Sequence, residues 1–127
     1  MTRQQSWSCR AAQAVQRVQA AHRRDEKTSE AEYLRFAKGF PALVHNSGLC
    51  QALAFALAKK RRGYAEDLAY TLGLSLSAEE LLELSRTASA ASYLRLSREV
   101  LAASSWLKRY AEALLKDDEQ NQEGEEP

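Results

Sequence analysis

The sequence has little of what β-structure needs. Isoleucine is absent, valine occurs only four times, and the two prolines are Pro41 and Pro127. β-Branched residues favour strands, whereas alanine and leucine, which dominate here, favour helices. The composition therefore predicts an all-α protein.

Other absences narrow the possible functions. The two cysteines, Cys9 and Cys50, match no metal-ligand or redox spacing, so we expect reduced thiols and no disulfide. His22 and His45 stand far apart without paired carboxylates, and no glycine-rich phosphate loop occurs. We therefore expect no metal, no cofactor and no catalytic site, and we interpret the chain as a binding protein rather than an enzyme.

Long apolar runs are also missing. None approaches the roughly 18 residues of a membrane span, and the N-terminus lacks the hydrophobic stretch of a signal peptide. The expectation is a cytoplasmic protein that makes no contact with a membrane.

Charge is present but unevenly placed. Lys and Arg number 18 and Asp and Glu number 17, and six of these acids lie in residues 117–127, which contain no base. Residues 1–116 therefore carry 11 acids and a net charge of +7. We predict one helical domain over 1–116 and an acidic, disordered tail over 117–127. A basic domain attracts polyanions, most often nucleic acid.

Apolar residues recur at helical spacing along the domain. One stripe begins at Trp7 and Ala11, and another, on the last and longest helix, includes Leu96, Val100 and Leu107. The predicted helices cover roughly 4–23, 30–38, a short helix from Pro41 to the turn at 46–48, 49–62, 64–74, 78–86 and 89–116.

Local signals set the expected helix boundaries. Ser77 followed by Glu80 predicts a capping box, and a serine at 89 or nearby opens the last helix. Gly39 and Pro41 together predict a break, since proline suits a first helical turn. Gly63 is expected to cap the helix that ends in the basic run before it.

A row of arginines on the first predicted helix is one candidate contact surface. Arg3, Arg10, Arg17 and Arg24 recur every seven residues and mark a stripe roughly 30 Å long, mostly away from the apolar face. Such a stripe could follow a phosphate backbone. It could equally be an ordinary solvated helix face. The sequence leaves both interpretations open.

Two further basic clusters support a nucleic-acid partner. One is the run Lys59, Lys60, Arg61 and Arg62, and the other comprises Arg95, Arg98, Lys108 and Arg109 on the last helix. Trp106 and Tyr110 lie one turn apart on that helix. They could stack on bases or on another chain, but packing in the core is the more common fate of such a pair.

Two segments together resemble a known family. Residues 36–55 read FAKGFPALVHNSGLCQALAF, and the last helix carries YLRLSRE at 93–99 and WLKRYA at 106–111. In their order and spacing they resemble the small helical subunit of the type III-B CRISPR effector, the Cmr complex. The resemblance covers roughly residues 30–116, whereas the acidic tail and Gly39 depart from the family pattern.

The resemblance implies a compact bundle of about six helices without enzymatic activity. It implies self-association inside a ribonucleoprotein, beside the backbone RNase subunit and the large polymerase-like subunit. The target RNA of the guide–target duplex becomes the partner of the basic surfaces. Lys38, Lys108 and Arg109 are the candidates that match basic positions of the family.

The sequence therefore predicts a non-catalytic subunit that stacks as a filament and stabilises target RNA in antiviral defence. Ten residues are its candidate RNA contacts: Arg10, Arg17, Arg24, Lys38, Lys59, Lys60, Arg61, Arg62, Lys108 and Arg109. A helical protein–protein adaptor or a DNA-binding transcriptional regulator is the alternative.

Overall fold

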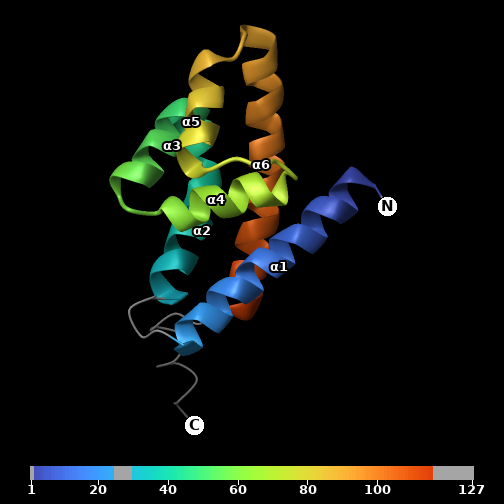
Figure 1. Ribbon diagram of the computed structural model, residues 1–127, viewed down its shortest axis with the longest axis vertical. Coiled ribbons are helices and arrows are strands. Elements are labelled where there is room, and N and C mark those ends of the chain that lie inside the picture. Colours follow the sequence, from blue (N-terminus) through green and yellow to red (C-terminus); the bar gives the residue numbers. More distant parts are fainter. Residues whose placement is uncertain (1, 25–29, 116–127) are drawn as a thin grey trace.

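Six α-helices make up the part of the chain that the structure describes (Figure 1). The computed structural model describes residues 2–24 and 30–115, with the side chains of 22–24 left out of the description. The helices are α1 (Arg3–Arg24), α2 (Glu30–Ser47), α3 (Leu49–Ala58), α4 (Arg62–Thr71), α5 (Ala78–Thr87) and α6 (Ala90–Leu114). The predicted all-α fold with a long last helix is confirmed, whereas the acidic tail lies outside the described residues.

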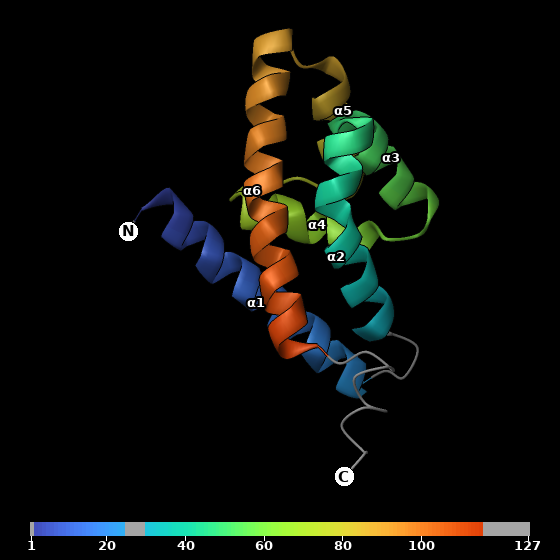
Figure 2. The ribbon, with the colours of Figure 1, turned by 180° about the vertical axis from the view of Figure 1, so that it is seen from behind.

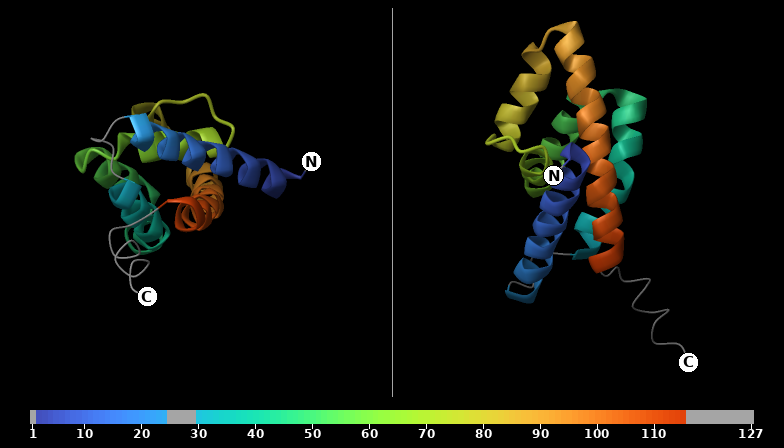
Figure 3. Two further views of the ribbon diagram at one scale, coloured as in Figure 1. Left: turned by 90° about the horizontal axis from the view of Figure 1, so that it is seen from below. Right: turned by 90° about the vertical axis from the view of Figure 1, so that its right-hand side faces the viewer.

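The long helix α6 is the spine of the bundle. It packs against α1 on one side and α2 on the other, as Figure 2 shows from behind. The short helices α3, α4 and α5 fill the remaining side, where α3 packs on α5 and α4 packs on α1 (Figure 3). Residues from the beginning and the end of the chain therefore share one interface.

Small residues let these helices approach closely. Fully buried alanines include Ala11 and Ala14 on α1 and Ala103 and Ala111 on α6, two helices that pack against each other. Larger buried side chains, such as Leu107, belong to the same core. The predicted apolar stripes of the first and last helices are thus the faces that build the core.

An aromatic cluster joins α2 to α4. The ring of Tyr64, at 1% exposure, lies 5.0 Å from that of Phe40, 5.2 Å from that of Phe36 and 5.6 Å from that of Tyr33, measured between centroids. Such edge-on contacts add to the stabilisation from burial. Burial raises the pKa of the Tyr64 hydroxyl well above its ordinary value. The cluster therefore fixes α4 relative to α2.

The predicted start of α5 is confirmed. The Ser77 side chain accepts a hydrogen bond from the Glu80 backbone N–H, and the Glu80 carboxylate accepts one from the Ser77 N–H. Ser89 caps α6 by accepting from the Ser92 N–H at 3.2 Å. These side chains satisfy amides that have no partner inside the helix.

The predicted break at Gly39 and Pro41 is wrong. A single helix, α2, runs through both residues from Glu30 to Ser47. Its buried side chains, at positions 31, 34, 37, 40 and 44, keep helical spacing across the glycine and the proline. Packing of that continuous stripe against α6 and α3 outweighs the backbone hydrogen bond that proline removes.

The predicted cap at Gly63 is also wrong, because Gly63 lies inside α4. Instead, α3 ends at Ala58 and Lys60 adopts the left-handed conformation, with φ of 60°. The Lys60 N–H donates to Leu57 O and the Arg61 N–H to Ala56 O, the pairing of a Schellman motif. The chain must reverse before α4 begins at Arg62, so a lysine takes the position that glycine usually fills.

Candidate nucleic-acid interface

Arg10, a member of the predicted arginine stripe, makes a structural contact. Its Nε donates a hydrogen bond to the backbone O of Thr71, 3.0 Å away, at the last residue of α4. Just beyond it, Gly73 has φ of +79°, and a Cβ there would come within 3.1 Å of the Arg10 guanidinium. Arg10 therefore places a positive charge where a helix end has unpaired carbonyl groups.

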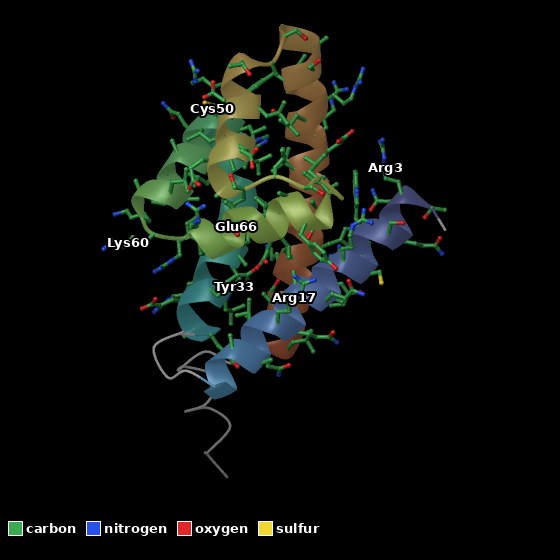
Figure 4. The ribbon with its side chains drawn as sticks, viewed as in Figure 1. Arg3, Arg17, Tyr33, Cys50, Lys60 and Glu66 are labelled. Carbon is green, nitrogen blue, oxygen red and sulfur yellow. The ribbon has the colours of Figure 1, made fainter. Side chains whose placement is uncertain are left out.

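Arg17 belongs to a polar cluster between α1, α2 and α4. Its guanidinium carbon lies 4.2 Å from the centre of the Tyr70 ring, and Tyr70 donates to Gln13 Oε1. Nearby, Tyr33 donates to Asp67 Oδ2 at 2.6 Å. Figure 4 shows Arg17 and Tyr33 beside this junction.

The Asp67 carboxyl in this cluster has an unusual pKa of about 6, raised from 3.8 mainly by burial. The hydrogen bond from Tyr33 and the positive charge of Arg17 act the other way and lower the pKa. Arg17 therefore helps a buried carboxylate to remain ionised at neutral pH.

Arg3, at the start of the stripe, has partners of its own. Arg3 lies 3.6 Å from a carboxylate oxygen of Glu99 and 5.5 Å from the centre of the Trp7 ring. Arg24 is the last residue of α1, and its side chain lies outside the description. Since Arg3, Arg10 and Arg17 each face a different partner, the stripe is not a uniform cationic track. Its contact with RNA stays a prediction.

The basic run 59–62 spans the turn between α3 and α4 and the first residue of α4. Arg61 lies 3.4 Å from a carboxylate oxygen of Glu32. Arg62 contacts Glu79 and, at 2.9 Å, Glu66. The hydrogen bond to Glu79 is the main cause of a raised Arg62 pKa. The two arginines are thus held by carboxylates.

The two lysines of this turn are not held in that way. Lys59 and Lys60 are exposed, and neither forms an ion pair with any described residue. The Lys59 ammonium lies 5.6 Å from the centre of the Phe55 ring. Lys60 projects from the side of the molecule opposite to Arg3 (Figure 4). These ammonium groups are therefore available to an anionic partner.

A shallow pocket of about 290 Å³ lies beside the turn, between α2 and α3. Phe36 and Phe55 form its apolar part, with their rings stacked at an interplanar angle of 8° and a centroid distance of 6.3 Å. Phe55 is 42% exposed, which is unusual for so large an apolar side chain. The remaining lining residues are charged: Glu32, Arg35, Lys59 and Arg61.

The basic residues of α6 have aromatic neighbours. Lys108 is half-buried, while Arg109 is exposed, with its guanidinium carbon 6.0 Å from the centre of the Trp106 ring. Trp106 donates to Gln4 Oε1 at 2.8 Å, and the Tyr110 hydroxyl lies 2.7 Å from Ser8 Oγ. The half-buried pair Trp106 and Tyr110 therefore ties α6 to α1.

The ten candidate residues come from several helices and one turn. The run 59–62 lies on the α3–α4 turn, whereas Lys108 and Arg109 lie on α6 and Lys38 is exposed on α2. Sequence reasoning about contacts missed Phe55, although one signal was available. Phe55 lies off the apolar face of its helix and one turn before Lys59.

Other kinds of site are absent from the described ranges 2–24 and 30–115. No group of three or more His, Cys, Asp or Glu side chains there lies close enough to hold a metal ion. No described helix is both long and apolar enough to cross a membrane.

Comparison with known proteins gives consistent matches. A family model described as "CRISPR-associated protein (Cas_Cmr5)" matches residues 4–114. The CRISPR system Cmr subunit Cmr5 of Thermus thermophilus is 40% identical over 119 residues, which cover 91% of this chain and 98% of the relative. A crystal structure of a CRISPR-associated Cmr5 family protein from the same organism superposes with a TM-score of 0.79 at 38% identity. That alignment covers 91% of this chain and 100% of the other.

Proposed function

The chain belongs to the Cmr5 family of CRISPR-associated proteins, and on this basis we propose that it is a non-catalytic Cmr subunit that stabilises target RNA. In this role it binds phosphates through its basic surfaces and assembles with the other Cmr subunits, including copies of itself. The proposed site of action is the cytoplasm, in antiviral defence.

The main observation in favour of an RNA contact is a pair of lysines at the α3–α4 turn. Lys59 and Lys60 are exposed, close in sequence and without ion-pair partners among the described residues. An ammonium that keeps no carboxylate partner can bind a phosphate without first breaking an ion pair. The turn is also fixed by the Schellman hydrogen bonds, so its lysines are presented at a defined place.

Contacts of this kind suit a guide-directed complex. Phosphate contacts position a nucleic acid without reading its sequence. In such a complex, base pairing with the guide reads the sequence, so a subunit that binds only backbone serves every target equally. Specificity for one RNA sequence is therefore not expected of this chain.

For stacking, we propose a groove between α5 and α6. It has a volume of about 180 Å³ and is lined by Leu84, Ala88, Ser92, Arg95, Leu96 and Glu99. Leu84 is 40% exposed, and the single cation and single carboxylate in the lining balance each other. An apolar groove without net charge suits a protein surface better than RNA, and we assign it to a second copy of the chain.

A mobility-shift series tests the RNA proposal. Single-stranded RNA, duplex RNA and duplex DNA are titrated with the full chain over a range of salt concentrations. Neutralisation of three to five phosphates predicts a log–log slope of roughly −2 to −3.5 on single-stranded RNA. A single copy is expected to bind weakly, with affinity rising when copies stack.

The alternatives give different results in the same assay. An adaptor would show no salt-dependent RNA binding. A DNA regulator would bind one duplex DNA sequence as a two-fold dimer. Either result would contradict the RNA proposal.

A further inference from the structure

We propose that the pocket beside the α3–α4 turn binds one unpaired base of single-stranded RNA, stacked on the half-exposed ring of Phe55. This inference rests on the proposed RNA contact and goes beyond it, because it assigns a base-binding site in addition to phosphate contacts.

The shape of the pocket favours a flat ring. Phe36 and Phe55 already lie nearly parallel, with an interplanar angle of 8° and centroids 6.3 Å apart. Phe36 is supported from behind by Phe40 and Tyr64, at centroid distances of 5.7 Å and 5.2 Å. The platform is therefore anchored in the core, while 42% of Phe55 remains exposed to a ligand. Aromatic platforms of this kind stack bases of any sequence.

The charge around the pocket favours an anion. Three of its lining residues, Arg35, Lys59 and Arg61, are cationic, and Glu32 is the one carboxylate among them. Arg61 lies 3.4 Å from a Glu32 carboxylate oxygen, which offsets that negative charge. The Lys59 ammonium lies over the Phe55 ring, 5.6 Å from its centre. A base that stacks on this ring therefore displaces the ammonium, which can then bind the phosphate of the same nucleotide.

A nucleotide explains both features together. The rings alone would also suit an apolar peptide, and the cations alone would suit any polyanion. An unpaired nucleotide combines a flat base with a phosphate at short distance, and single-stranded RNA recognition commonly uses aromatic stacking with cationic contacts. The α5–α6 groove, which has no stacked rings and no excess of cations, lacks both features.

The test compares two probes on the full chain. One is a short oligoadenylate with 2-aminopurine at one position, and the other is an abasic oligonucleotide of the same length and charge. The wild-type chain is expected to bind oligoadenylate about tenfold more tightly than the abasic probe and to quench the 2-aminopurine fluorescence.

Variants at Phe55 identify the platform. Phe55→Leu keeps an apolar side chain but removes the ring, so the tenfold preference should disappear while the salt slope stays unchanged. Phe55→Trp should keep the preference. Leu94→Ala is the matched control, because Leu94 is another large apolar residue, 56% exposed, on α6. If Phe55→Leu fails to fold, quenching in the wild type and in Phe55→Trp decides the question.

Each outcome has one meaning. Equal binding of both probes by the wild type overturns the stacked base but leaves the phosphate contact standing. No binding of either probe overturns the proposed RNA function itself. If Phe55→Leu binds both probes as the wild type does but no longer assembles with the other Cmr subunits, the pocket holds a protein segment and the stacked base is wrong.

Discussion

Two basic regions of this chain, the arginines of α1 and the lysines of the α3–α4 turn, differ in whether their charges have partners. The arginines of α1 face folded partners: Arg10 binds the end of α4, and Arg17 lies on Tyr70 beside Asp67. The lysines of the α3–α4 turn face solvent, without ion pairs to described residues. Basic residues in a sequence therefore show where positive charge lies, but not whether that charge is free to bind an anion. We expect the first region to support the fold and the second to bind RNA.

The strongest prediction for the α1–α4 junction is that the free energy of unfolding depends on pH through Asp67. The folded carboxyl has a pKa of about 6 against an ordinary value of 3.8. Between these values the folded state holds a proton that the unfolded chain releases, so stability falls as pH rises through this window and then levels off. Two pKa units correspond to roughly 2–3 kcal/mol. Urea unfolding from pH 3.5 to pH 7 measures it.

The matched variant is Asp67→Asn, which can still accept the hydrogen bond from Tyr33. We expect the difference in unfolding free energy between variant and wild type to grow in favour of the variant between about pH 4 and pH 6. A difference that is constant over this range would contradict the burial argument for the α1–α4 junction.

The next effect is the loss of the Arg10 contact. Arg10→Ala leaves the Thr71 carbonyl at the end of α4 without its charged donor, and hydrogen bonds to charged groups contribute about 1.5–3 kcal/mol. Thermal unfolding should show this loss, while the salt slope of RNA binding changes little. A variant of unchanged stability with a shallower salt slope would reverse the roles assigned to the two regions.

A third effect concerns the lysines. The double variant Lys59→Ala, Lys60→Ala removes two candidate phosphate contacts, so the log–log salt slope should become shallower by roughly 1.4, with affinity lower by about tenfold. The unfolding free energy should stay the same, because these side chains are exposed. Arg62→Ala is the control, since Arg62 contacts Glu66 and Glu79 instead. An equal loss for control and double variant would contradict the distinction.

The smallest expected effect is at Lys38, an exposed residue of α2. Lys38→Ala should leave stability unchanged and reduce the slope by no more than about 0.7, the value of one phosphate contact on a single strand. The same RNA titration checks it. A larger loss would add α2 to the RNA-binding region and weaken the contrast between the turn and α1.

Most of the helices could be predicted from the sequence, because the apolar spacing and the serine caps are local signals. Ser77 and Glu80, three residues apart, form the expected capping box. Local signals failed where packing decides. Glycine and proline usually interrupt a helix, but the buried stripe of α2 continues through Gly39 and Pro41. Gly63 was the expected cap, but α3 ends earlier, in a Schellman motif with Lys60 in the left-handed conformation, and Gly63 lies inside α4.

The candidate site was harder to predict because the role of each residue depends on contacts with residues that are far away in the sequence. Arg10 and Thr71 are 61 positions apart, so nothing local marks Arg10 as a contact to a helix end. Phe36 and Phe55 belong to different helices, and their stacking exists only in the folded chain. Local patterns located the charges, but the tertiary structure determines which of them face a partner.

The most direct measurement is a crosslinking map. The Cmr complex containing this chain is assembled on target RNA substituted with 4-thiouridine, irradiated, and digested for identification of modified peptides. We expect adducts at the end of α3 and in the turn that follows it, around Phe55 and Lys59. Adducts confined to the arginine face of α1, with none in that segment, would contradict it.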